Sequence, residues 1–294
     1  MSNFHIGIIA ILLSSVIWAL AIIFFRLSSE KLTNFAVNTG KNVVGFTAFS
    51  LTLLILGKRF FPDIPPNHYY LLLVSGFIGI GLGDLLFIRS LAILGAGLNA
   101  IVGCLYTPFL IIGAVLFLGE SISVLLIIGG ILVIGGIVIS SLDKIEYLPD
   151  KLWLGIFLGA MGMGLTVVGV IIIKHLLSQY NLFWINWIRF IGGLFFYLIY
   201  IGVVRDKKAL FRGLRNRHNL KVLFVGGFLG AYLAIIMWTL SLALLDASLV
   251  AVVNQLTVIV IIALAYFILK EPITLKKTTA VFLAISGAVL AVFS

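Results

Sequence analysis

The stretch GFIGIGLGDLLFIRSLAILGAG, residues 76–97, decides the fold, because the chain repeats its pattern as GFLGAYLAIIMWTLSLALLDAS at residues 227–248. The two stretches share a Gly-Phe-x-Gly start and a Ser-Leu-Ala centre. Each is apolar over a length that crosses the roughly 30 Å core of a bilayer as a helix. The repetition predicts two similar halves built around apolar helices.

Charged residues repeat as well as apolar ones, which rarely happens by chance. At offsets of 148 and then 151 residues the matches are Arg26 with Lys174, Lys41 with Arg189, and Glu120 with Glu271. We therefore expect an internal duplication, with one repeat over residues 1–146 and the other over residues 147–294.

Composition excludes a soluble domain. Apolar residues make up 62% of the 294 residues and charged residues only 10%, with a mean hydropathy of +1.26. Soluble domains carry about a quarter charged residues, so most of this surface must face lipid. The N-terminal apolar run is longer than that of a signal peptide and lacks a cleavage motif, so we expect it to remain as the first span.

Ten apolar stretches are long enough to cross a bilayer as helices. They cover residues 5–26, 35–57, 69–91, 97–118, 122–141, 152–173, 182–204, 222–244, 247–269 and 275–293. Each half holds five spans, and an odd number gives the halves opposite orientations. Inverted repeats are common in secondary transporters, whose substrate sites lie between the repeats. The sequence thus predicts an all-α integral membrane protein of ten transmembrane helices in two inverted five-helix repeats.

Short motifs recur in the same order in both halves. The first half has Gly83-Asp84, Ser90-Leu91, Gly95-Ala96, Pro108 and Leu118-Gly119-Glu120, and the second has Ala243, Ala247, Asn254-Gln255 and Leu269-Lys270-Glu271-Pro272. This ordered set resembles the EamA-type repeat of the drug/metabolite transporter superfamily over essentially the whole chain. The resemblance implies a ten-helix carrier of small metabolites, amino acids or drugs, often an exporter. Lys270 departs from the pattern, because the family usually has glycine before the closing glutamate.

Asp84 is the clearest candidate for a functional residue. It lies inside an apolar span, where an ionisable group is costly and usually functional. Lys41 lies at a similar depth from the same membrane face and is its expected partner. The pair is either a structural tie between two helices or a part of substrate binding or coupling.

Arg189 is the repeat equivalent of Lys41, but Ile235 stands at the equivalent of Asp84. The second half therefore has a basic residue without the matching acid. We expect the Arg189 side chain to extend to the membrane interface. The alternative is that it faces a wet cavity and holds an anionic group of a substrate.

Amide and aromatic side chains inside the spans are further candidates. Asn254 and Gln255 lie about two turns into the ninth span, where amides hydrogen-bond between helices or contact a substrate. Pro108 is expected to kink the fourth span. Five aromatic residues either line a cavity or pack against helices and lipid: Trp18, Tyr106, Trp187, Tyr232 and Trp238.

Glu120 and Glu271 each stand at a junction just before the next span. A carboxylate there favours the positive end of a helix dipole. We expect both to cap helix N-termini, and a gating role is the alternative.

Motifs for metal-dependent hydrolysis, phosphate loops and nucleophile elbows are absent from the sequence, which argues against an enzyme. We expect no metal, cofactor or nucleic-acid partner, only a small-molecule solute and the bilayer. No ATP-binding motif is present, so a proton or solute gradient is the expected energy source. The alternative function is a flippase for a lipid or lipid-linked sugar, which a laterally open apolar groove would favour.

Two arguments about orientation in the cell membrane disagree. Most of the basic residues that give the net charge of +10 fall on one side, above all between Arg205 and Lys221. The positive-inside rule makes that side cytoplasmic, next to anionic headgroups, and leaves both termini outside. The family resemblance implies both termini inside.

Overall fold

The computed structural model describes residues 2–141, 151–204, 206–214 and 216–270, with scattered positions between 275 and 293. All regular elements in those residues are helical, as predicted. Six helical stretches are long and apolar enough to cross a membrane: Asn3–Ser29, Pro66–Ala100, Leu152–Lys174, Leu182–Val203, Arg217–Leu244 and Ala247–Leu269. The count of ten stays a prediction, and the tenth range lies largely outside the described residues.

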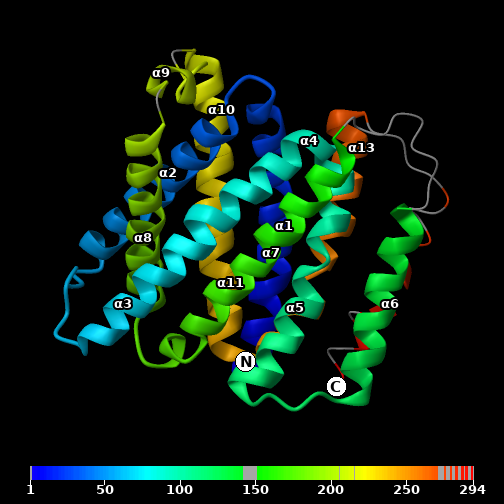
Figure 1. Ribbon diagram of the computed structural model, residues 1–294. Helices are drawn as coiled ribbons and strands as arrows, with labels where there is room; N and C mark the ends of the chain where they lie inside the picture. Colours follow the sequence, from blue (N-terminus) through cyan, green and yellow to red (C-terminus); the bar gives the residue numbers. More distant parts are fainter. Residues whose placement is uncertain are drawn as a thin grey trace.

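The helices run side by side as a bundle (Figure 1). The first half contains α1 (Asn3–Ser29), α2 (Asn34–Ile55), α3 (Pro66–Ser75), the π-helical segment η1 (Gly76–Gly83), α4 (Asp84–Gly103), α5 (Tyr106–Gly113), the π-helical segment η2 (Ala114–Leu118) and α6 (Val124–Ser141). The second contains α7 (Leu152–Lys174), the short 3₁₀ turn η3 (Leu176–Ser178), α8 (Leu182–Val203), α9 (Lys207–Leu210), α10 (Arg217–Gly227), the π-helical segment η4 (Phe228–Ala234), α11 (Ile235–Leu244), α12 (Ala247–Asn254) and α13 (Leu256–Leu269).

Polar residues fix where several helices begin. The Thr33 hydroxyl accepts a hydrogen bond from the backbone N–H of Ala36 at the start of α2, at 3.1 Å. The Asn181 amide oxygen does the same for Phe183 at the start of α8, at 3.0 Å. Such caps satisfy backbone donors that the first helical turn leaves free.

The third span of each half is distorted at the same place. The segments η1 and η4 are both π-helical and correspond at the repeat offset of 151 residues. In η1 the carbonyl oxygen of Gly81 accepts from the Tyr197 hydroxyl at 2.7 Å, and that of Ile80 from the Asn42 amide at 3.3 Å. A π-helical turn disturbs the regular backbone ladder, and side chains from neighbouring helices compensate here.

The two halves interleave. Helix α1 packs against α10, η4, α11 and α13 of the second half, whereas α7 packs against α3, η1, α4 and α5 of the first. Helices α2 and α8, the second spans of the two halves, also pack against each other. The first span of each repeat is therefore built into the other repeat, and the shared interior lies between them.

Glycines let α8 approach the third span of the first half backbone to backbone. A Cβ placed on Gly192 would lie 2.1 Å from the carbonyl oxygen of Leu73, and one on Gly76 would lie 1.9 Å from that of Arg189. No side chain fits at such distances. The contact holds the Arg189 backbone against η1 and so fixes where its side chain enters the interior.

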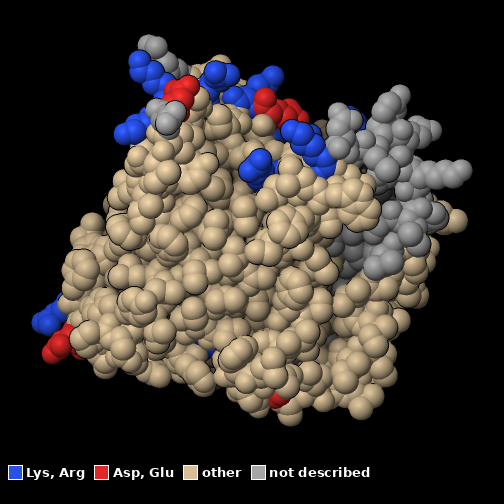
Figure 2. Space-filling view, viewed as in Figure 1, with Lys and Arg blue, Asp and Glu red and all other residues tan. Residues whose placement is uncertain are grey.

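The surface has the pattern expected for a membrane protein. In Figure 2 the middle of the visible face carries almost no charged side chains, while Lys and Arg gather at the upper end near α9 and the start of α10. Exposed basic residues there are Lys207, Lys208, Arg212, Arg217 and Lys221. Large apolar side chains such as Ile55, Leu198 and Val203 are exposed on the helices, where lipid would cover them.

Candidate functional site

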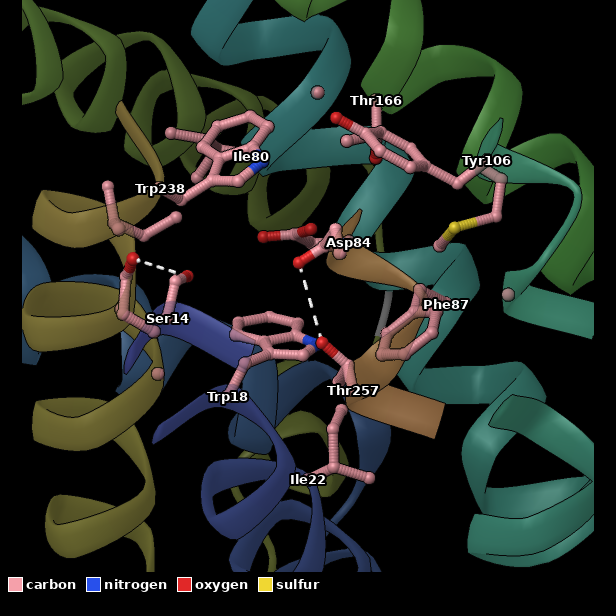
Figure 3. A pocket seen from close by; sticks show the side chains of 18 of the residues that line it. Ser14, Trp18, Ile22, Ile80, Asp84, Phe87, Tyr106, Thr166, Trp238 and Thr257 are labelled. Carbon is pink, nitrogen blue, oxygen red and sulfur yellow. Dashed lines mark hydrogen bonds between the residues drawn. The ribbon is translucent and has the colours of Figure 1, made fainter. Parts of the chain in front are cut away.

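A cavity of about 160 Å³ lies between the two halves, and helices of both repeats line it. Its walls come from α1, α2, η1, α4 and α5 on one side and from α7, α8, η4, α11, α12 and α13 on the other. Figure 3 shows Trp18, Asp84, Tyr106 and Trp238 arranged around this space.

Sixteen of the 26 lining residues form eight repeat-equivalent pairs. At the offsets of 148 and 151 residues these are Trp18 with Thr166, Lys41 with Arg189, Gly79 with Gly230, Ile80 with Ala231, Asp84 with Ile235, Phe87 with Trp238, Gly103 with Asn254, and Tyr106 with Thr257. Equivalent positions thus face one space, as inverted repeats around a midplane site would place them. The chemistry of the pairs differs, so the two walls are not alike.

Lys41 and Asp84 form an ion pair inside the cavity wall. The Lys41 ammonium donates to Oδ2 of Asp84, and it also lies 6.0 Å from the centre of the Phe25 ring. The Lys41 side chain is 4% exposed and that of Asp84 is 22% exposed. The pairing anticipated from depth in the membrane is present, and Asp84 is the partner that reaches the open space.

Arg189 does not extend to the interface, and that expectation was wrong. The residue is 2% exposed and lines the cavity. Its Nε donates to the Ser75 hydroxyl at 3.1 Å and Nη1 to the Asn186 amide oxygen at 3.4 Å. The backbone contact between α8 and η1 places the side chain in the cavity wall, and binding of an anionic group by Arg189 stays a prediction.

Three of the five aromatic candidates line the cavity: Trp18, Tyr106 and Trp238. Trp187 instead stacks on Phe46 and donates its indole N–H to the Ser50 hydroxyl at 2.8 Å. Tyr232 hydrogen-bonds the Thr52 hydroxyl at 2.6 Å. Both therefore pack helices together outside the cavity.

The fourth span of each half is broken at equivalent positions. In the first half this span follows a kink at Gly95 (φ 78°) within α4, and it breaks between Gly103, where α4 ends, and Tyr106, where α5 begins. In the second half α12 ends at Asn254 and α13 begins at Leu256. Pro108 explains the first break, because it lacks the N–H that would bond the carbonyl of Cys104; that carbonyl accepts from Thr107 at 3.1 Å instead. Discontinuous helices at corresponding positions of two repeats are a good pointer to a binding site.

Asn254 and Gln255 stand at the second break, and both line the cavity. The Gln255 amide donates to the Thr107 hydroxyl of the other broken helix. The Thr107 hydroxyl in turn donates to the carbonyl oxygen of Ala251 at 3.0 Å. The two broken helices are thus tied together by their own side chains.

Asn99 was missed from the sequence. It is 1% exposed and lines the cavity, and its Oδ1 has no hydrogen-bond partner among the described residues. The Tyr106 hydroxyl is also buried, beside Trp238. An asparagine inside the expected span 97–118 was the available signal, as for Asn254.

Glu120 caps a helix, but not the helix that follows it. Its carboxylate accepts from the backbone N–H groups of Ala247 at 2.7 Å and Ser248 at 3.0 Å, and from the Ser248 hydroxyl. It therefore closes the N-terminus of α12 in the other half, consistent with the dipole argument. Glu271 lies outside the described residues.

Comparison with known proteins agrees with this architecture. No curated protein sequence matches the chain. One solved crystal structure aligns with 99% of this chain and 96% of its own, with a TM-score of 0.75 and 16% identity, so it shares the fold.

The sequence model of the EamA-like transporter family matches residues 5–142 and again residues 153–293. The chain belongs to this family and is a multi-pass membrane transporter of the drug/metabolite transporter superfamily. Members of the family carry small-molecule solutes and are not enzymes.

Proposed function

We propose that the protein is a secondary transporter of a small organic metabolite, such as an amino acid or a drug-like solute, and that the cavity between the repeats is its substrate site. The observation that carries the proposal is the set of repeat-equivalent residues facing one cavity. Two inverted repeats, 1–146 and 147–294, would exchange conformations and open the cavity to each side of the membrane in turn.

Residues of the cavity wall would bind the solute and couple its transport to a gradient. Asp84 reaches the cavity beside Lys41 and is our candidate for proton or substrate coupling. Arg189, Asn254, Gln255, Tyr106, Trp18 and Trp238 would contact the solute. Glu120 would hold the junction between the halves. Export across the cell membrane is the direction that the family resemblance favours.

A lipid flippase is the competing proposal. A lipid headgroup and its chains need an apolar groove that is open to the bilayer. This cavity instead contains Lys41, Asp84 and Arg189, all within its wall. Charged groups in the cavity wall favour a water-soluble cargo.

Reconstituted liposomes distinguish the two. We expect liposomes loaded with a mixture of small metabolites to accumulate a labelled member of that mixture by counterflow, and we expect no acceleration of the movement of a fluorescent phospholipid between leaflets. Fast phospholipid movement without solute counterflow would favour the flippase.

A further inference from the structure

The cavity contains more positive than negative charge. Its described lining has two basic residues, Lys41 and Arg189, and one acid, Asp84. Asp84 is paired with Lys41. Within the described part of the chain Arg189 has only neutral acceptors, the Ser75 hydroxyl and the Asn186 amide oxygen. Arg189 also lies within electrostatic reach of Asp84, so the two cations share one carboxylate. An excess cation buried between helices is costly, and the cavity therefore favours an anion.

Two further polar groups lie in the wall. Asn99 Oδ1 is an acceptor, and the Tyr106 hydroxyl can donate or accept. Asn99 Oδ1 is buried and unpartnered among the described residues, and the Tyr106 hydroxyl is buried beside Trp238. A cargo that carries a hydroxyl or amine would satisfy Asn99, because its oxygen can only accept.

Aromatic side chains form another part of the wall, among aliphatic and neutral polar ones. Phe87 and Trp238 occupy equivalent positions in the two halves, and the Trp18 ring lies 6.4 Å from that of Phe87. Trp238 and Ile235 make the second-half wall apolar where the first half has Asp84. The volume of about 160 Å³ resembles that of the roughly 150 Å³ cavity known to bind benzene.

From these three features we infer that the cargo is a small organic anion with a single planar ring, and that Arg189 binds its carboxylate or similar group. The inference rests on the proposed function, whose substrate class it narrows. Zwitterions such as amino acids fit less well, because their ammonium would need a carboxylate and Asp84 already serves Lys41. A hydroxyl or amino group on the ring meets Asn99.

The charge of the cargo can be tested by measuring how tightly charged and neutral aromatic probes bind to the purified protein. The probes are benzoate, neutral benzamide, cationic benzylamine and zwitterionic phenylalanine, each at millimolar concentration, and quenching of tryptophan fluorescence reports Kd because Trp18 and Trp238 face the site. We expect benzoate to bind about ten- to a hundredfold more tightly than benzamide, as one charge-assisted hydrogen bond allows.

Variants assign that preference to Arg189. Arg189→Gln should bind benzoate and benzamide equally, whereas Arg189→Lys keeps the charge and should retain part of the preference. Arg89→Gln is the matched control, because Arg89 is exposed on α4 and does not line the cavity. Asn99→Val, which installs the residue found at the repeat-equivalent Val250, should remove any advantage of 4-hydroxybenzoate over benzoate.

The inference is overturned if benzamide, benzylamine or phenylalanine binds as tightly as benzoate, if Arg189→Gln keeps the preference, or if no probe binds. These outcomes are separable from failure of the proposed function. Counterflow of neutral or zwitterionic solutes alone would support the proposed transport function and contradict the anionic cargo. Benzoate binding that depends on Arg189, without counterflow of any solute, would support the anion site and contradict the proposed transport function.

Discussion

Lys41 and Asp84 are the pair on which the mechanism depends. Each would be costly to leave charged and alone between apolar helices, and together they are neutral. Asp84 is nevertheless 22% exposed toward the cavity, so a solute or a proton can reach it. Removing one member of a buried pair lowers stability by about 3–5 kcal/mol in measured cases, whereas replacing both members by apolar residues is often neutral. Comparing the single and double replacements therefore separates a structural role from a coupling role.

The double replacement Asp84→Leu with Lys41→Leu tests whether the pair has a structural role or a coupling role. A purely structural pair predicts that the double variant transports normally. We expect instead that Asp84→Asn lowers gradient-driven uptake at least about tenfold and that the double variant does not restore it, because the carboxylate carries the coupling proton. Uptake into liposomes, with and without an imposed pH gradient, is the measurement.

Elution of each variant as a single folded species is the control in that experiment. Normal transport by the double variant would show that Asp84 has only a structural role, as one half of an ion pair that joins α2 and α4.

Sequence reasoning placed Asp84 beside Lys41 because both lie in apolar spans at matching depths. It misplaced Arg189, because the depth of a residue does not say which face of its helix turns inward. That depends on Gly76 and Gly192, whose close backbone contact orients α8. Asn99 was missed although it lies inside the expected span 97–118, because its repeat equivalent is the apolar Val250 and so no paired polar residue marked it.

At the scale of the helices, α8 packs backbone to backbone against the third span of the first half, and this contact positions Arg189 in the site. Gly192 and Gly202 lie on the same helix, yet a Cβ on Gly192 would lie 2.1 Å from a backbone oxygen and a Cβ on Gly202 would meet nothing within 4 Å. The first therefore has no room to relax, whereas the second faces open space.

Gly192→Ala and Gly202→Ala form a matched pair. We expect Gly192→Ala to destabilise the protein by about 1–3 kcal/mol or more through overpacking. Gly202→Ala should be neutral or stabilising by up to about 1 kcal/mol, because alanine favours the helix. Thermal unfolding of the detergent-purified variants reports the difference, and equal midpoints would show that the contact is looser than described.

The positions of most helices could be predicted from apolar length alone. The predicted spans 152–173 and 182–204 correspond closely to α7 and α8, for example. The broken fourth spans could be predicted only in part. Pro108 gives a sequence signal for the first break, but no proline marks the second, at Gln255. The π-helical segments η1 and η4 had no signal, because they depend on partners such as Tyr197 from another helix.

For the molecule as a whole, sequence could show the repeats but not their interleaving. Apolar helices match many partners equally well, so nothing local tells α1 to pack against α11 and α13 of the other half. The target of Glu120 was hidden for the same reason, since it caps α12 rather than the helix beside it in the chain.

Orientation in the membrane is tested by a pair of surface cysteines. Lys208 lies in the basic loop at one end and Lys58 in the loop at the other, and both are exposed. Following the family resemblance, we expect an impermeant maleimide to label Lys208→Cys, but not Lys58→Cys, in intact cells. The wild type is the background, because its single Cys104 is buried. The reverse pattern would establish the orientation that the positive-inside rule gives.

Access to the cavity from both sides of the membrane can be measured directly at Gly103. This residue lines the cavity, and a Cβ there would meet nothing within 4 Å, so Gly103→Cys in a Cys104→Ala background adds a reactive group without crowding. Gly202→Cys, near the C-terminal end of α8, is the matched control. Alternating access predicts that impermeant maleimide reaches Gly103→Cys from either side of the membrane, in proportions that shift when solute is added, while Gly202→Cys reacts from one side only. Labelling of Gly103→Cys from a single side under all conditions would contradict a cavity that opens to both sides.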